Sequence, residues 1–262
     1  MDLGLRDKVA IVTGSSDGIG LVTARALARE GVRVVVCARR AAKLFDARDM
    51  IVKDTGAEVL AVQCDVRTLD DVQRLVGDTL QRFGAIQILI NNAGSVPSIK
   101  FTEVSDAQWY EYLERKLMGF LRVTREIVPH MQKAGWGRII NVAGSAGWEP
   151  SHTGMAVGLN NAAVMNWTKS MSLQYASDGI LVNTVAPGSI DTPRQVGNRQ
   201  RESEVTGKSV EELRKARVKD IPLGRLGRPE EVANLIVFLA SECSSYMTGT
   251  CVTIDGGVVR GI

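Results

Sequence analysis

Short apolar runs rich in β-branched residues alternate with longer amphipathic stretches along this chain. Such alternation predicts parallel strands joined by crossover helices, with helices on both faces of one sheet. The strand candidates are residues 8–13, 32–37, 58–63, 87–90, 138–142, 180–185 and 251–254. The helix candidates are residues 20–30, 41–55, 69–83, 106–133, 153–176 and 229–241. We therefore expect one α/β domain over residues 1–262, a doubly wound parallel sheet of about seven strands with its ligand at their carboxyl ends.

The first strand candidate leads directly into a glycine-rich turn that opens a helix. It reads Thr13-Gly14-Ser-Ser-Asp-Gly18-Ile19-Gly20. Glycines permit positive φ and let a pyrophosphate approach the backbone, and the first N–H groups of the following helix face an anion. One such turn also suits ordinary chain reversal, so it is weak evidence by itself. As a nucleotide site it would be formed by Gly14, Ser16, Asp17, Gly18, Ile19 and Gly20.

Further motifs follow in order along the chain. Cys64-Asp65-Val66 follows the third strand candidate, and Asn91-Asn92-Ala93-Gly94 follows the fourth. Pro187-Gly188-Ser-Ile190-Asp-Thr192 comes after the sixth, and residues 222–231, 246–249 and 255–257 complete the set. Together with the glycine turn, these motifs resemble the short-chain dehydrogenase/reductase family over nearly the whole chain.

The resemblance implies a Rossmann-type fold, a nicotinamide nucleotide, a small-molecule substrate, and assembly as a homodimer or homotetramer. It also implies hydride transfer between the nicotinamide and a carbonyl or alcohol carbon. In the family, the segments after the third and fourth strands hold the adenine ring and support the central strands, and a later segment covers the nicotinamide. The residues so implicated are Asp65, Val66, Asn91, Asn92, Ala93, Gly94, Pro187, Gly188, Ile190 and Thr192.

The end of the second strand favours NADP(H) over NAD(H). NAD sites commonly present a carboxylate there to the ribose 2′-OH, whereas this chain has Ala38 followed by Arg39 and Arg40. A guanidinium pairs bidentately with a 2′-phosphate, which a carboxylate would repel. The alternative is that both arginines are solvated charges at the start of the next helix.

The family moves its proton with Tyr, assisted by Lys, Ser and Asn, and all four positions differ here. By resemblance, Gly144 stands at the Ser position, Val157 at the Tyr and Asn161 at the Lys, and Lys116 stands at the Asn. Valine neither donates nor accepts a proton. Loss of a general acid costs roughly 10²- to 10⁴-fold in rate, so another group must handle the proton if the chain is an enzyme.

Three residues are candidates for that replacement. Lys116 should point into the same pocket, and its pKa falls readily in such surroundings. His152 titrates in the useful range, and Ser145 follows the vacant Ser position. Each also suits a purely structural role. Asn161 could hold a water where the family's Lys would hold the ribose, but it carries no charge.

Three functions remain open on the sequence. The first is an NADP(H)-dependent oxidoreductase with a non-standard proton donor. The second is a catalytically silent nucleotide-binding protein, acting as a sensor or as a subunit of a mixed oligomer. The third is non-redox chemistry on the same fold, which the intact nucleotide motifs disfavour. The sequence leans slightly to the enzyme.

Charge is concentrated between residues 193 and 220, where the family has a flexible substrate lid. This segment suits a solvated helical hairpin or, alternatively, the guiding of an anionic substrate by Arg194, Arg199 or Arg201. Overall, 32 basic and 29 acidic residues are too balanced to imply nucleic acid.

The remaining features point to a cytoplasmic protein. No amino-terminal targeting segment and no stretch long enough to span a membrane are present, so no membrane partner is expected. No metal site is expected, because the four cysteines, Cys37, Cys64, Cys243 and Cys251, lack C-x-x-C spacing. We expect all four to be reduced and buried.

Overall fold

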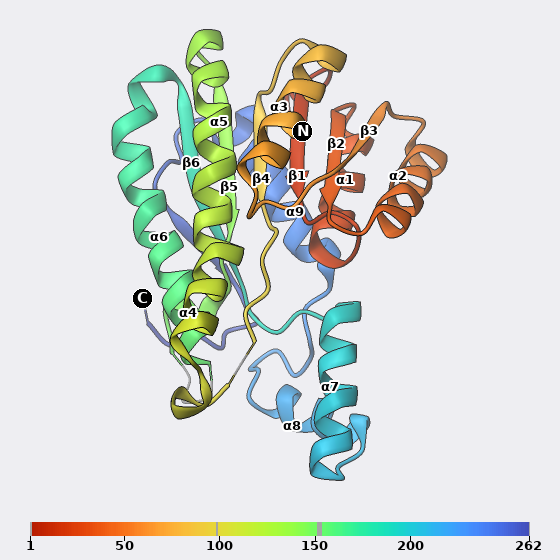
Figure 1. Ribbon diagram of the computed structural model, residues 1–262, viewed down its shortest axis with the longest axis vertical. Coiled ribbons are helices and arrows are strands. Elements are labelled where there is room, and N and C mark those ends of the chain that lie inside the picture. Colours follow the sequence, from red (N-terminus) through yellow and green to blue (C-terminus); the bar gives the residue numbers. More distant parts are fainter. Residues whose placement is uncertain (1, 98, 151–153, 262) are drawn as a thin grey trace.

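The computed structural model describes residues 2–97, 99–150 and 154–261. Its centre is a seven-stranded parallel sheet in the order β3-β2-β1-β4-β5-β6-β7 (Figure 1). The strands are β1 (Val9–Thr13), β2 (Arg33–Ala38), β3 (Val59–Gln63), β4 (Ile88–Asn91), β5 (Gly137–Val142), β6 (Ile180–Pro187) and β7 (Cys251–Ile254). The predicted doubly wound α/β fold with about seven strands is confirmed.

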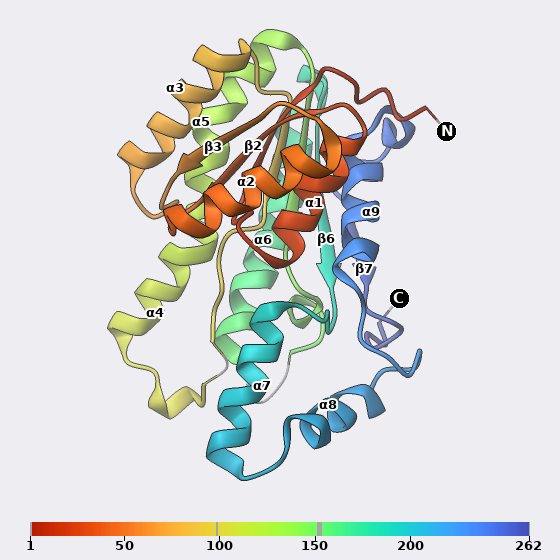
Figure 2. The ribbon, with the colours of Figure 1, turned by 90° about the vertical axis from the view of Figure 1, so that its right-hand side faces the viewer.

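The helices lie in two layers, one on each face of the sheet. Helices α1, α2 and α9 cover one face, and α3, α5 and α6 cover the other (Figure 2). The α-helices are α1 (Gly18–Arg29), α2 (Ala41–Thr55), α3 (Leu69–Phe83), α4 (Asp106–Leu113), α5 (Gly119–Ala134), α6 (Met155–Tyr175), α7 (Pro193–Thr206), α8 (Val210–Lys219) and α9 (Pro229–Ala240). Short helical turns are η1 (Phe101–Glu103), η2 (Glu114–Met118), η3 (Ser145–Gly147), η4 (Ala176–Asp178) and η5 (Glu242–Ser244).

The central strands are buried on both faces, which explains their continuous apolar sequence. Along β1, Ala10 and Val12 enter the core beneath α1, α2 and α9, while Val9 and Ile11 enter the core on the opposite face. This alternation follows from the period of two along a strand. Because every side chain of β1 is buried, a ligand can reach this central strand only beyond its ends.

The predicted helix over residues 106–133 is present as one continuous helical run, whose repeat is interrupted by one irregular turn. The structure has α4 and α5 joined by η2, a π-helical turn. A π turn adds a residue to the helical repeat, and apolar periodicity does not reveal such an insertion. Lys116 lies within it and is only 9% exposed. Most other helix and strand bounds lie within two residues of the prediction, as expected for element ends.

Helices α7 and α8 project beyond the carboxyl ends of the strands (Figures 1 and 2). They occupy the segment predicted as a substrate lid. Each begins with a side-chain cap: Thr192 Oγ1 accepts from the Gln195 N–H, and Ser209 Oγ accepts from the Glu212 N–H. These caps fix where both helices start.

The prediction that all four cysteines are buried was wrong. Cys37 and Cys64 are buried, but Cys243 is exposed in the turn after α9, and Cys251 is half-buried at the start of β7. All four are free thiols. A separate observation is that no helix in the described ranges is long and apolar enough to cross a membrane.

Candidate functional site

The residues predicted to bind a nucleotide lie at the carboxyl ends of β1 to β4 and β6, along one edge of the sheet. The glycine turn is tied to the segment after β4. Thr13 Oγ1 accepts from the N–H groups of Asn92 and Ala93, at 2.9 and 3.0 Å. The Asn92 side-chain amide donates to the carbonyls of Thr13 and Gly14, at 3.0 and 3.1 Å. The two segments therefore form one rigid unit.

The backbone at the glycine turn leaves no room for side chains. Gly14 has φ +67°, and a Cβ there would lie 2.8 Å from Cα of Ala93. A Cβ on Gly20 would lie 2.5 Å from Nδ2 of Asn92. Both glycines are thus required by close packing. Ser16, Asp17, Gly18 and Ile19 are half-buried at the opening of α1, where they remain accessible to a ligand.

The segment after β6 faces this turn. Its end, Thr192, places Cβ and Cγ2 3.7 Å from the position of a Cβ on Gly18. Ile190 makes an isolated parallel bridge with Gly227. Pro187 and Gly188 lie against β7, since the Gly188 N–H donates to the Ile254 carbonyl at 3.0 Å. The segment therefore closes the edge of the cleft opposite the glycine turn.

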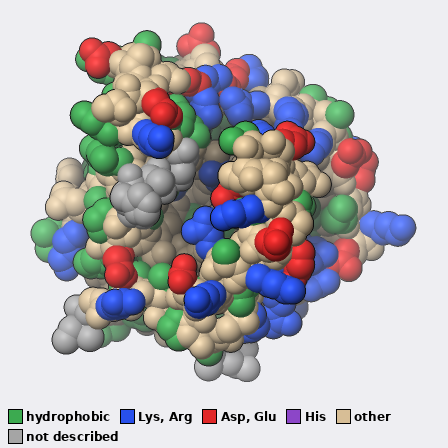
Figure 3. All heavy atoms as spheres, turned by 90° about the horizontal axis from the view of Figure 1, so that it is seen from below, with side chains coloured by type: hydrophobic (Ala, Val, Ile, Leu, Met, Phe, Trp, Pro, Cys, Tyr) green, Lys and Arg blue, Asp and Glu red, His purple; other side chains and the backbone are tan. Residues whose placement is uncertain are grey.

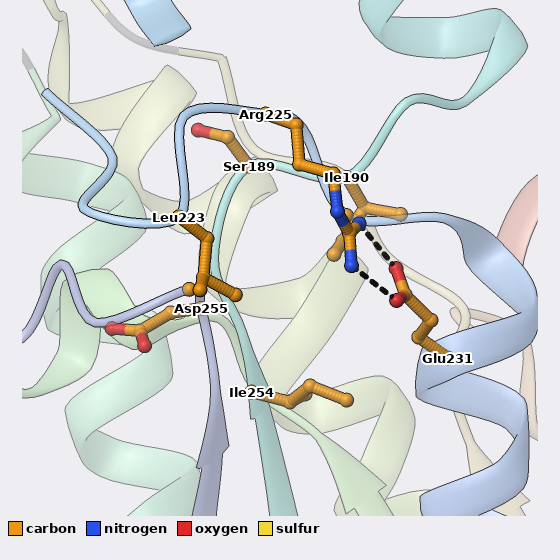
Figure 4. Close-up of a pocket in the computed structure, with 9 residues that line it drawn as sticks. Ser189, Ile190, Leu223, Arg225, Glu231, Ile254 and Asp255 are labelled. Atoms are coloured by element: carbon orange, nitrogen blue, oxygen red, sulfur yellow. Dashed lines mark hydrogen bonds and ion pairs between the residues drawn. The ribbon is translucent and has the colours of Figure 1, made fainter. Parts of the chain in front are cut away.

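Behind Ile190 is a small cavity of about 90 Å³, lined also by Ser189, Leu223 and Ile254 (Figure 4). Arg225 donates two hydrogen bonds to Glu231 at one side of it, at 2.9 and 2.7 Å. This bidentate pair ties the return from α8 to the first turn of α9. We regard this cavity as structural.

A larger hollow of about 410 Å³ lies beyond the ends of β2 and β3. Arg39 lines it, together with Gln63, Asp65, Asp71 and Arg74. Arg74 is anchored there, because its guanidinium donates to the Gln63 carbonyl at 2.8 Å and pairs with Asp71 at 2.8 Å. The neighbouring Arg40 instead pairs with Asp17 at 3.4 Å.

Asp65 in this hollow is a paired carboxylate. Burial alone would raise its pKa, but hydrogen bonds from Arg67 and the charges of Arg67 and Arg39 outweigh burial and lower it. Arg67 reaches both carboxylate oxygens, with its Nη2 2.6 Å from Oδ2. The next residue, Val66, is buried and packs against Gly119. Arg39 and Arg74 therefore flank the hollow as cations. Its two carboxylates already form ion pairs, Asp65 with Arg67 and Asp71 with Arg74.

The residues considered for proton transfer lie near the end of β5, and we call the surroundings of the Lys116 amine there the reaction end. Lys116 Nζ donates to the Val142 carbonyl at 3.2 Å and sits 5.6 Å from the centroid of the Phe120 ring. Burial, and secondly the charge of Arg194, lower the pKa of Lys116 to about 8. A buried amine with that pKa can both give and take a proton near neutrality.

Three of the positions singled out by the resemblance surround this end. A Cβ on Gly144 would lie 3.3 Å from Nδ2 of Asn161. Asn161 is 2% exposed, and its Oδ1 is buried with no hydrogen-bond partner among the described residues. Val157 belongs to an apolar cluster with Val96 and Tyr112. The site therefore combines an amide, an amine and an apolar wall.

Comparison with known proteins identifies the family. Residues 14–259 match the family model described as "Enoyl-(Acyl carrier protein) reductase". The chain is 36% identical to the 3-oxoacyl-[acyl-carrier-protein] reductase FabG of Thermotoga maritima, over 97% of this chain and 99% of that one. The chain belongs to the short-chain dehydrogenase/reductase family.

Two further relatives of this dehydrogenase/reductase inform its chemistry. The cis-4-hydroxycyclohexanecarboxylate dehydrogenase of Sinomonas cyclohexanicum is 35% identical over 96% of both chains. The crystal structure of L-sorbose reductase from Gluconobacter frateurii, complexed with NADPH and L-sorbose, superposes with a TM-score of 0.96 at 33% identity and covers 100% of both chains. The relatives named here are thus reductases and a dehydrogenase.

Not all predicted site residues can be placed in this family member. His152 lies outside the described residues. Ser145 opens η3 and is half-buried next to Gly144. The sequence analysis did not single out Arg74, which lines the hollow with Arg39, because Arg74 belongs to none of the motifs. Arg74 lies near the start of α3, the helix that follows β3, and this position is the sequence signal that places it near Arg39.

Proposed function

We propose that this protein is an NADP(H)-dependent oxidoreductase that interconverts a carbonyl and an alcohol, with Lys116 moving the proton. The observation that carries the proposal is the placement of the Lys116 amine. It is buried at the end of β5, held by the Val142 carbonyl, and its pKa is lowered to about 8 by burial and by Arg194. An ammonium in that position donates a proton to a substrate oxygen as the carbonyl is reduced.

The nucleotide site fits a dinucleotide with a 2′-phosphate. Close packing at Gly14 and Gly20 fixes the shape of the glycine turn, and the opening turn of α1 presents its N–H groups to an anion. Arg39 and Arg74 flank the hollow beyond β2 and β3, where a 2′-phosphate would be bound. NADPH in the structure of L-sorbose reductase supports the same choice. When bound, NADPH supplies the hydride.

The protein's own side chains then orient the substrate oxygen and deliver the proton. The Val142 carbonyl and the Phe120 ring hold the Lys116 ammonium at the end of β5. Asn161 offers its amide beside Gly144, where it binds the substrate oxygen or a bridging water. Ser145 is a second candidate donor at the same strand end. Val157 adds apolar surface and takes no part in proton transfer.

Lys116→Met tests this assignment, because it keeps the length of the side chain and removes the amine. We expect the kcat for reduction of a ketone panel to fall roughly 10²- to 10⁴-fold, since a general acid contributes about that much. The Kd for NADPH, measured by fluorescence quenching, should stay within about threefold of wild type. Retention of full turnover in Lys116→Met would refute the role of the amine.

A second variant addresses the catalytically silent alternative. Gly144→Ser/Val157→Tyr/Asn161→Lys restores the residue types that the family uses, and thermal unfolding checks that it folds. If wild type binds NADPH but reduces no ketone, while the restored variant turns over, the protein is a nucleotide-binding pseudoenzyme. Turnover by wild type that is lost in Lys116→Met supports the enzyme.

A further inference from the structure

The cations at the reaction end of the cleft differ in whether they are neutralised. Arg115 forms an ion pair with Glu111 on the preceding turn and donates to the Ser95 carbonyl at 3.3 Å. No carboxylate in the described part of the chain forms an ion pair with Lys116 or Arg194. Among the described residues, neither charge therefore has a carboxylate within ion-pair distance, and the nearest acidic influence on Arg194 is Asp17, which pairs with Arg40.

The three lid arginines considered on the sequence differ in their partners among the described residues. Arg199 pairs with Asp191 at 2.8 Å, and its side chain is 12% exposed. Arg201 donates to Asn198 Oδ1 at 2.8 Å. Arg194 has neither kind of partner in the described ranges and is exposed. Arg199 is thus neutralised by its ion pair, whereas no described carboxylate pairs with Arg194 or Arg201, and of these two Arg194 is the one whose charge acts on Lys116.

Arg194 is also placed over the cleft. It stands two residues after Thr192, whose side chain packs at the opening of α1 beside Gly18. Its charge reaches Lys116 from the lid and contributes to the lowered pKa of that amine. On the face that carries the lid, a hollow opens with Lys and Arg side chains at its margin (Figure 3). Like charges facing one another across a cleft are unfavourable unless an anion lies between them.

We propose that the substrate carries a negative charge, in its simplest form a carboxylate, which the Arg194 guanidinium binds while the reacting carbonyl lies beside Lys116. This inference rests on the proposed function, because it names the class of substrate for the same site. A planar guanidinium binds a carboxylate bidentately, so Arg194 fixes the orientation of the substrate as well as its charge. A neutral ester of the same skeleton loses this contact but keeps the carbonyl.

Binding of the anion has a consequence for proton transfer. Lys116 is faced by Arg194 from the lid and by the Phe120 ring and Val142 carbonyl from the interior, while Arg115 and Glu111 on its own helix form an ion pair with each other. A bound carboxylate offsets the charge of Arg194 and so raises the pKa of Lys116. The ammonium is then retained to higher pH with an anionic substrate than with a neutral one.

The test compares a keto acid with its methyl ester, for example 4-oxocyclohexanecarboxylate and methyl 4-oxocyclohexanecarboxylate, on wild type and Arg194→Gln. Removing a bidentate charged contact should lower kcat/KM for the acid roughly 30- to 100-fold. The value for the ester should change less than about threefold, because the ester makes no charged contact. Arg214→Gln is the control, since Arg214 lies on α8 and pairs with Glu211 at 3.9 Å.

The competing partner for Arg194 is the pyrophosphate of the nucleotide. In that case Arg194→Gln would raise the Kd for NADPH and lower kcat/KM equally for acid and ester, and the inference would be overturned. An unchanged NADPH Kd with selective loss of the acid supports it.

Failure of the proposed function is separable from failure of this inference. If wild type turns over neither compound, the proposed function fails, and the binding of each compound to the NADPH complex is measured by calorimetry. Binding of the acid that weakens at least tenfold in Arg194→Gln, with weaker and unaltered binding of the ester, supports an anion site. Equal binding of acid and ester by wild type, or acid binding unaffected by Arg194→Gln, overturns it.

Discussion

The two ends of the cleft are built on different principles. At the glycine turn, binding groups are mainly backbone atoms held by close packing, as shown by the contacts that a Cβ on Gly14 or Gly20 would make. At the reaction end, the function proposed above depends on single side chains, Lys116 and Asn161, both of them buried. A tightly packed backbone site tolerates little change in volume, whereas a site built from single side chains can be altered one residue at a time.

Crowding the glycine turn should produce the largest loss. In Gly20→Ala the new Cβ would lie 2.5 Å from the Asn92 amide that ties the turn to β4. We expect the NADPH Kd to rise by about 100-fold or more and the free energy of unfolding to fall by roughly 1–3 kcal/mol. Fluorescence titration and urea unfolding measure the two effects.

Gly77→Ala is the matched control for that substitution. Gly77 lies within α3, and a Cβ there would meet nothing within 4 Å. Alanine in a helix interior should stabilise the protein by about 0.5–1 kcal/mol without altering NADPH binding. If both variants bind NADPH as wild type does, the nucleotide end is not held by packing, and the contrast between the two ends fails.

Selectivity between the two nucleotides should show the next largest effect. Arg39→Gln removes a guanidinium from the hollow shared with Arg74. Loss of one charged contact should reduce the preference for NADPH over NADH, measured as a ratio of kcat/KM, by roughly 10- to 100-fold. Arg48→Gln on α2, where Arg48 pairs with Asp49 at 2.7 Å, should leave the ratio unchanged. An unaltered ratio in Arg39→Gln would place the 2′-phosphate elsewhere.

The pH dependence of reduction tests whether the Lys116 amine transfers the proton. Burial and the charge of Arg194 lower the pKa of Lys116 to about 8. In the proposed mechanism reduction uses the protonated amine, so kcat with a neutral ketone should be level at lower pH and fall about tenfold per pH unit above that value. Alcohol oxidation requires the free amine and should instead rise through the same pH. Lys116→Arg, which stays protonated, should abolish the alkaline limb, and a limb that persists belongs to another group.

The sequence predicted the fold and the nucleotide end far better than the reaction end. The short, continuous apolar runs between the helices predict the strands, because β1 and β2 are buried on both faces. The glycine turn is visible because only glycine fits the backbone there. The π turn that buries Lys116 leaves no periodic signal, and the placement of Arg194 near Lys116, 78 residues earlier in the chain, depends on tertiary structure. Such relations become visible only when the chain is folded.

The smallest predicted effect concerns the glycine beside Asn161. Gly144 has φ −53° and ψ 155°, which any residue adopts, so only packing opposes a side chain. In Gly144→Ala the Cβ would lie 3.3 Å from Asn161 Nδ2 and 3.5 Å from the Pro187 carbonyl oxygen, a tight but adjustable fit. We expect the free energy of unfolding to fall by less than about 1 kcal/mol and kcat to change less than roughly threefold. A loss as large as that of Gly20→Ala would show that the reaction end is as rigidly packed as the glycine turn, and the difference between the two ends would then lie in their chemistry alone.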